Sequence, residues 1–226
     1  IQNDGIVNVY NNGTASDTTV KNMGTLNIQG AGIASGTTTI EDGGLINASS
    51  GGEIIENLVV EDGGKFNLTN TAEITNISVE GQTGSITGAN ANGIVINDGS
   101  NLYVRNGSAS GTVVQNGGTL NIENSATVTG TTIETGGHLI ANSSGSTISD
   151  MTIQDGGTFE LSTNVDVSDL KDKDGNSLGS IASGTATNIT LNKGATLDVE
   201  SSDVADNTTV NGGELNVFGT ANTVTV

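Results

Sequence analysis

The sequence predicts an all-β fold, a right-handed parallel β-helix (β-solenoid) of about 12 coils. Three observations lead to this fold class. A motif of the form aliphatic–x–Asn/Asp–Gly–Gly–x–aliphatic–x–aliphatic returns about every 19 residues, and a repeat of this length must stack on its neighbours because it cannot bury its own apolar residues. Short runs in each repeat alternate apolar and polar residues, as strands do. No segment has helical periodicity, and the 34 glycines would make helices costly.

Each repeat contains a corner followed by a strand. The Asn/Asp-Gly-Gly element supplies the positive-φ residues that a sharp corner requires. The alternating run after it, such as 26–28 or 120–122, is expected to be a strand with two inward aliphatic side chains. A second strand, such as 37–40, follows about ten residues later. Crossovers between parallel strands are nearly always right-handed, so the coil is expected to be right-handed.

Equivalent residues of successive coils are expected to stack along the rod. The repeats start at Ile1, Val20, Ile40, Val60, Ile96, Val114, Ile133, Ile153, Leu191 and Val210. One internal ladder is predicted to contain Leu26, Ile46, Phe66, Leu120, Leu139, Phe159, Leu197 and Leu215. Burial of each such side chain contributes about 1.5–3 kcal/mol.

Two segments lack the Gly-Gly element. Residues 79–95 and 165–184 are each predicted to be an interrupted coil, in which a β-hairpin or loop leaves the rod. The uniform period elsewhere predicts one continuous stack over 1–226. Because the chain starts and ends within a repeat, we expect it to be a single β-helical segment of a longer, processed protein.

Composition narrows the classes of function. The net charge of −19 argues against nucleic acid and anionic membranes as partners, because phosphates require a basic surface. Catalysis of the kind found in β-helical polysaccharide lyases and glycosidases needs paired acids, or an acid with Arg or Lys, in a cleft lined by sugar-stacking aromatic residues. Here Arg105 is the single Arg, His138 the single His, and Trp is absent. We therefore expect no enzyme activity, no cofactor and no EF-hand metal site.

The repeats resemble those of a known family of surface proteins. The phrase Thr-Thr-Val/Ile followed by x-Asn/Asp-Gly-Gly-x-Leu-x-Val, and the segments 13–20 and 184–191, are similar to the passenger domains of self-associating autotransporter adhesins, the antigen 43, AIDA and TibA family. The resemblance covers essentially the whole chain and extends to the interrupted coils.

The resemblance implies a location and a partner. It implies a passenger on the bacterial cell surface, exported across the outer membrane through its own C-terminal β-barrel after a signal peptide, with release as a secreted fragment as a further outcome. It implies lateral, homotypic binding to the same protein on neighbouring cells, which promotes aggregation and biofilm formation. It also implies O-heptosylation of Ser and Thr by a dedicated transferase.

The outward position of the predicted strand is Asn in many coils. Flanking aliphatic residues point inward, so these asparagines are expected to line one face of the rod. They are Asn8, Asn27, Asn47, Asn67, Asn121 and Asn216. One interpretation is an amide ladder that stabilises the coil. The other is a neutral, hydrogen-bonding stripe along which two acidic rods self-associate.

A second set of polar residues precedes the glycines at the corners. It contains Asn22, Asp42, Asp62, Asn116 and Asp155. These side chains either form the turn through bonds to the backbone or border the association face.

Three further hypotheses stay open. The chain could instead bind host glycan or protein through loops at 79–95 and 165–184, or act as a structural stalk. Asp172, Asp174 and Asn176 resemble half of a calcium loop, but Ser177 occupies the position of the required Gly and no bidentate Glu follows. That mismatch excludes an EF-hand and leaves only a weak calcium site open.

Overall fold

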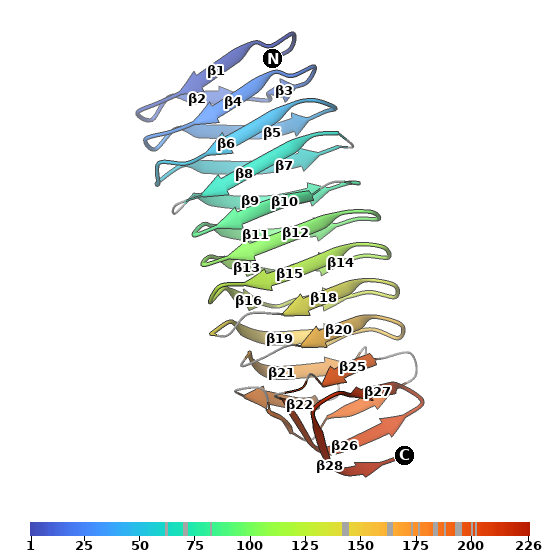
Figure 1. The fold of residues 1–226 in the computed structure, drawn as a ribbon. Helices are drawn as coiled ribbons and strands as arrows, with labels where there is room; N and C mark the ends of the chain where they lie inside the picture. The colour runs from blue at the N-terminus through green and yellow to red at the C-terminus, as the bar shows by residue number, and fades with distance from the viewer. Residues whose placement is uncertain are drawn as a thin grey trace.

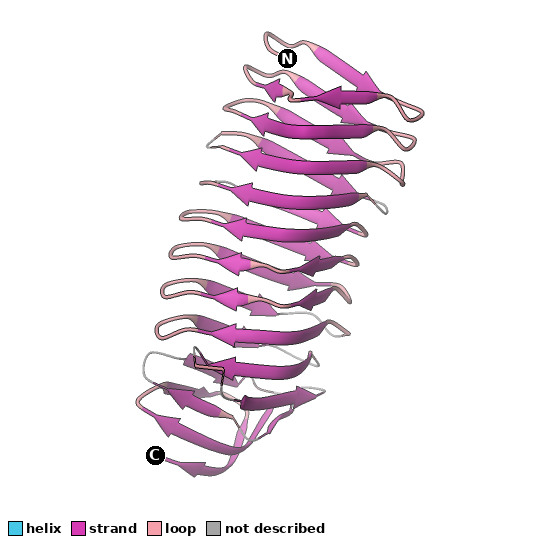
Figure 2. Ribbon diagram, turned by 180° about the vertical axis from the view of Figure 1, so that it is seen from behind, coloured by secondary structure: helices cyan, strands magenta, loops and turns pink. Residues whose placement is uncertain are grey.

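The protein is an elongated rod of stacked β-coils (Figure 1). The computed structural model describes residues 1–61, 63–69, 72–81, 83–141, 145–161, 165–172, 174–175, 177–182, 185–187, 189–192, 196–199, 201 and 203–226. These residues contain strands and turns but no helix, and hence no helix that could span a membrane. In Figure 1 the chain runs from right to left in front and returns behind as it descends, and Figure 2 shows the same path from the back. This path is right-handed, as predicted.

One side of the rod is an entirely parallel sheet, here called sheet A. In stack order its strands are β1 (Ile6–Val9), β4 (Thr25–Ile28), β6 (Leu45–Ala48), β8 (Lys65–Thr69), β10 (Thr83–Thr87), β12 (Asn101–Arg105), β15 (Thr119–Glu123), β18 (His138–Ala141), β20 (Thr158–Leu161), β25 (Thr196–Val199) and β27 (Glu214–Val217). Each strand pairs in register with the next, so that Leu26 lies between Val7 and Ile46. Equivalent side chains therefore recur at the strand spacing of about 4.8 Å.

The remaining strands form sheet B on the other side. They are β2 (Thr14–Ser16), β3 (Thr19–Val20), β5 (Ile33–Ile40), β7 (Ile54–Val60), β9 (Glu73–Val79), β11 (Asn90–Ile96), β13 (Ser108–Ser110), β14 (Val113–Val114), β16 (Thr127–Thr129), β17 (Thr132–Ile133), β19 (Thr147–Ile153), β21 (Asp166–Asp172), β22 (Ser177–Ala182), β23 (Thr185–Thr187), β24 (Thr190–Asn192), β26 (Val204–Asn211) and β28 (Thr220–Thr225). Left-handed residues such as Gly36, Asn76 and Gly93 lie midway along its strands β5, β9 and β11. Gly, Asn and Asp adopt this conformation at least cost.

The core between the sheets is a set of aliphatic ladders. The predicted ladder from Leu26 to Leu197 is buried, and Leu215 packs against it partly buried. The strand pairing shows that Gly84 and Leu102 also belong to this ladder, between Phe66 and Leu120. At Gly84 a Cβ atom would overlap the Phe66 ring, so this ring fills the space that an aliphatic side chain takes in other coils.

The Asn/Asp-Gly-Gly corners form as predicted. The N–H of the second glycine donates to the carbonyl three residues earlier, over 2.9 Å at both Gly44 and Gly118. The first glycine has a positive φ, 72° at Gly43. The second glycine is needed for close packing, because a Cβ at Gly64 would lie 2.5 Å from the Ile40 carbonyl oxygen of the preceding coil.

The prediction that 79–95 is an interrupted coil is wrong. Strand β10 lies in sheet A and pairs in parallel with both β8 and β12, while β9 and β11 pair directly in sheet B. The coil closes without a Gly-Gly pair because Gly81, with φ of 63°, supplies a left-handed residue at the corner. Among the described residues of this segment, 79–81 and 83–95, no hairpin or loop leaves the rod.

The prediction for 165–184 is confirmed. Strand β22 runs antiparallel to both β21 and β23, and β20 pairs directly with β25, so this segment adds no strand to sheet A. Within the described ranges sheet A therefore has 11 strands, against the expected number of about 12 coils. The segment belongs to sheet B at the lower end of the rod in Figure 1.

Candidate functional site

The predicted asparagine face is the outward side of sheet A. Strand pairing places one outward residue from each coil in a single line, here called the outer row. The outer row consists of Asn8, Asn27, Asn47, Asn67, Ser85, Tyr103, Asn121, Ile140, Glu160, Asp198 and Asn216. All the asparagines predicted from the alternating pattern lie in it.

The first four members of the outer row form an amide ladder. The Nδ2 atom of Asn27 donates to Asn8 Oδ1 over 2.8 Å, that of Asn47 to Asn27 over 3.0 Å, and that of Asn67 to Asn47 over 3.2 Å. Each side chain in the middle of the ladder uses one N–H and one acceptor site. Because an amide has two of each, the remainder stays available at the surface.

The later asparagines have different surroundings. Asn121 is 6% exposed, and its Nδ2 has no hydrogen-bond partner among the residues that the structure describes. Its neighbours in the outer row are Tyr103 and Ile140, which cannot continue an amide ladder. Asn216 donates to Asp198 Oδ1 over 2.8 Å. The pattern thus correctly predicted a shared face but did not distinguish these three environments.

The corner residues are exposed at one edge of sheet A. Asn22, Asp42, Asn116 and Asp155 are exposed, while Asp62 lies outside the described residues. A Cβ at Gly63 would overlap the Asp42 carboxylate, and a Cβ at Gly136 would overlap the Asn116 amide. Both corner side chains therefore lie against the following coil, where the corner glycine leaves room for them.

Charge is distributed unevenly along sheet A. The strands from β1 to β18 contain one carboxylate, Glu123, whose Oε2 is 2.5 Å from Arg105 Nε. The last three strands add Glu160, Asp198 and Glu214. In a chain of net charge −19, the greater part of this face is therefore nearly free of negative charge.

The residues considered for catalysis and metal binding are dispersed. His138 Nε2 lies 3.6 Å from Glu160 Oε2, and Arg105 is occupied by Glu123. The described residues contain no group of three or more His, Cys, Asp or Glu that could hold a metal ion. Of the segment considered for calcium, Asn176 and the side chain of Asp172 lie outside the described residues.

Comparison with known proteins places this rod in a family. The AIDA model, described as "Adhesin of bacterial autotransporter system, probable stalk", matches residues 78–137 and 174–226, which together make up half of the chain. A solved structure, a hyper-glycosylated fragment of TibA whose glycosylation is catalysed by TibC, covers 100% of this chain and 91% of its own, with a TM-score of 0.66 and 22% identity. That likeness shows the fold. No curated protein matches significantly. On the family match, the chain belongs to the AIDA family of bacterial autotransporter adhesins.

Proposed function

We propose that this non-enzymatic segment mediates homotypic, lateral self-association between bacterial cells, and thereby aggregation and biofilm formation. The contact surface is the outward side of sheet A. The observation that carries the proposal is the combination of an exposed amide ladder with a face that holds one carboxylate between β1 and β18. The cell surface is the location that membership of an autotransporter adhesin family implies.

Electrostatics favours this face over others. Two rods of charge −19 repel one another, and the repulsion is smallest where they approach with few carboxylates. Each exposed hydrogen bond contributes only about 0.5–1.5 kcal/mol. The stacked coils offer many such bonds in parallel, and many copies on each cell multiply them, so weak contacts are sufficient to hold cells together.

Charge also favours one orientation of the pair. Parallel rods in register would place Glu160, Asp198 and Glu214 opposite their own copies. Antiparallel rods place these carboxylates opposite the amide ladder of the other copy, whose N–H groups can donate to them. We therefore propose an antiparallel contact that includes Asn27, Asn47, Asn67, Asn121 and Asn216. The corner residues Asn22, Asp42, Asp62, Asn116 and Asp155 border it.

Sedimentation velocity over a wide concentration range tests the proposal. The parent chain is expected to shift reversibly to a dimer or larger species. Replacing Asn27, Asn47 and Asn67 with Asp should leave it monomeric.

A matched control adds the same charge to the opposite face. Thr39, Thr132 and Thr152 are half-buried, outward residues of sheet B, and their replacement with Asp changes the net charge equally. This variant should associate like the parent. A strict monomer in the parent, with no aggregation of cells that display it, would reject homotypic binding, and equal loss in both variants would reject sheet A as the contact.

Ionic strength gives a second readout. Added salt should strengthen the pairing, because it screens the repulsion between the two acidic rods. Dissociation by salt would show instead that ion pairs dominate the contact.

A structural stalk is the second candidate, favoured by the family's description as a probable stalk. A stalk would show neither self-association nor binding of host glycan or protein. It would instead hold a distal segment away from the cell, and deleting coils would impair that segment's activity in proportion to the length removed.

Glycosylation is a further part of the proposal. TibA, the structural neighbour, is hyper-glycosylated by TibC. We propose that exposed threonines of sheet B, among them Thr14, Thr127, Thr129 and Thr147, accept O-linked heptose. Intact-mass measurement after co-expression with a heptosyltransferase of this kind tests it. An unchanged mass would refute the modification.

A further inference from the structure

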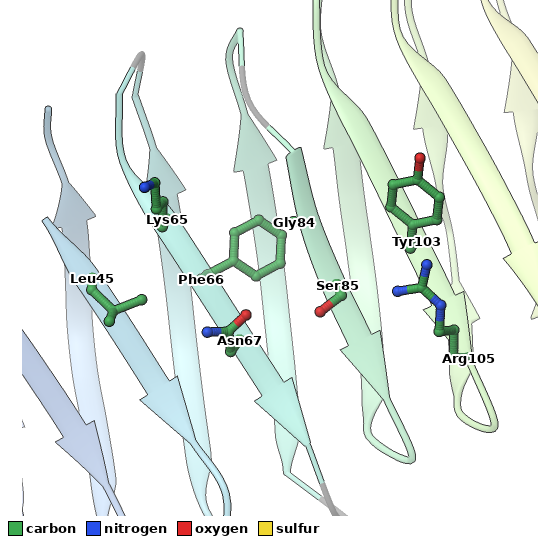
Figure 3. Close-up of a pocket in the computed structure, with 8 residues that line it drawn as sticks. All are labelled: Leu45, Lys65, Phe66, Asn67, Gly84, Ser85, Tyr103 and Arg105. Carbon is green, nitrogen blue, oxygen red and sulfur yellow. The ribbon is translucent and has the colours of Figure 1, made fainter. Parts of the chain in front are cut away.

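A hollow of about 420 Å³ interrupts the outward side of sheet A where the amide ladder ends. It lies over β10, between β8 and β12 (Figure 3). In the outer row Ser85 follows Asn67, and its short side chain neither continues the ladder nor fills the surface. The Phe66 ring, 2% exposed, lies against Gly84 below. A cavity of this volume is in the range of small-molecule sites.

Two of the chain's six basic residues line this hollow. Lys65 is exposed and has no ion pair among the described residues. Arg105 uses its Nε–H for Glu123, and within the described part of the chain its terminal nitrogens bind no other side chain, so their N–H groups can donate to a ligand. A guanidinium edge of this kind matches a carboxylate in geometry as well as charge.

Tyr103 adds an aromatic surface beside these cations. The Arg105 Cζ atom lies 4.4 Å from the centre of its ring, a cation–π contact that orients the guanidinium toward the hollow. The Tyr103 and Leu45 side chains offer apolar area, while Asn67 and Ser85 offer an amide and a hydroxyl. This set combines an apolar surface, neutral hydrogen-bonding groups and positive charge.

We propose that the hollow binds an anionic sugar, specifically the carboxylated pyranose ring of a uronic or similar acid. The carboxylate pairs with Arg105, while Lys65 adds positive charge at the other end of the hollow. The ring packs on Tyr103, and its hydroxyls bond to Asn67 and Ser85. An acidic rod can accept such a ligand here because β1 to β18 of sheet A carry only Glu123, which Arg105 already neutralises. The site goes beyond self-association and does not depend on it.

Tyrosine fluorescence measures this binding directly. The chain has no Trp and two tyrosines, so the Tyr10→Phe variant leaves Tyr103 as the single emitting residue. Titration with sodium glucuronate should change its emission with saturation and a Kd on the order of 1 mM, as expected for a small ligand in an open site. Glucose should bind at least fivefold more weakly, because it lacks the carboxylate.

Two variants in the same background test the assigned groups. Lys65→Gln should weaken glucuronate binding about twofold to fivefold, because it removes a nearby but solvent-exposed positive charge. Ser85→Asn should abolish it by filling the hollow, while thermal unfolding stays at or above the parent's midpoint because the amide ladder gains a member. Lys21→Gln is the matched control, since Lys21 is paired with Glu41 and does not line the hollow, and it should bind like the parent.

Several outcomes would overturn the site. The first is the absence of a saturable change in emission with glucuronate. The second is an equal response to sodium acetate or inorganic phosphate, which would indicate a plain anion site. The third is unaltered glucuronate binding in Lys65→Gln and Ser85→Asn. The titration is run at concentrations where sedimentation shows monomer, so its failure leaves the self-association result unaffected.

Discussion

In the first four strands of sheet A the outer row consists of asparagines that bind one another. From β10 onward it holds Ser85, Tyr103, Asn121, Ile140, two acidic residues and Asn216. The backbone register is the same in both halves, and the described inward residues of the sheet A strands are aliphatic apart from Gly84 and the two Phe rings. The inward positions are constrained by a shared core. The outward positions are constrained mainly by the outward residues of the two adjacent coils. The chemistry of the surface can therefore change from coil to coil while the fold stays the same.

The largest difference in the free energy of unfolding is expected between substitutions on the inward and outward sides of one strand. Leu26→Ala should lower the free energy of unfolding by about 2–5 kcal/mol, because it opens a cavity at a fully buried position. Asn27→Ala, one residue further, should cost no more than about 1–2 kcal/mol. Urea unfolding followed by circular dichroism compares the two, and equal losses would contradict the separation into a constrained inner side and a tolerant outer side.

A smaller effect is expected within the ladder. Asn47 both donates to Asn27 and accepts from Asn67, so Asn47→Ala removes two hydrogen bonds. The expected loss is about 1–2 kcal/mol, at the low end because these side chains are partly exposed. Ser85→Ala is the control outside the ladder and should be near neutral. If Asn47→Ala were equally neutral, the ladder would have no stabilising role.

In the other half of the outer row, replacing an asparagine is expected to leave the protein equally stable or to stabilise it. Asn121 is buried with an unpartnered Nδ2, so Asn121→Leu removes a polar group that lacks its hydrogen bond. Replacing such a group with an apolar side chain should leave the free energy of unfolding unchanged or raise it by up to about 1 kcal/mol. A loss comparable to that of Asn47→Ala would mean that Asn121 has a partner after all.

The smallest effect on stability is expected outside the outer row, from the ion pair between Lys171 of β21 and Asp150 of β19. The hydrogen bond and charge of Asp150, together with the charge of Asp169, raise the pKa of Lys171. A raised pKa in the folded state means that the contribution to stability is present below the usual lysine pKa and is lost as the pH rises through the raised value. The pair is solvent-exposed, so the contribution is small.

Thermal unfolding of the parent and of Lys171→Met tests this pair. The parent should unfold at a slightly higher temperature near pH 8, and the difference should disappear as the pH rises through the raised pKa of Lys171. A difference that persisted at high pH would have to come from packing of the lysine stem.

The repeat pattern predicted the coil well and its exceptions only in part. The corner glycines and the ladder from Leu26 to Leu197 follow directly from the alternation of residues, because these positions face the same core in each coil. The missing Gly-Gly pair did not distinguish 79–95, a regular coil, from 165–184, where strands turn antiparallel. A single left-handed residue can close a corner, so the absence of the pair is a weak signal of an interruption.

The candidate surface was predicted as a set of residues but not as a set of contacts. Sequence spacing placed Asn27 and Asn121 on the same face, and both lie there. Asn27 binds its neighbours, whereas Asn121 is buried beside Tyr103. This difference depends on the residues that the coils above and below place next to each of them. The hollow over Ser85 was not predicted at all, although the Gly84-Ser85 pair was a visible signal, because larger residues occupy both positions in the other coils.

The sequence by itself determined the period, the inward ladders, the corners and the acidity of the rod, because each of these follows from local patterns that repeat in every coil. Only the tertiary structure decided how outward residues from different coils combine. The amide ladder, the unpartnered Asn121 and the hollow between Lys65 and Arg105 all depend on strands that are neighbours in space and about 20 residues apart in the chain. Register between coils sets these neighbours, and register is fixed by the packing of the whole stack rather than by any one repeat.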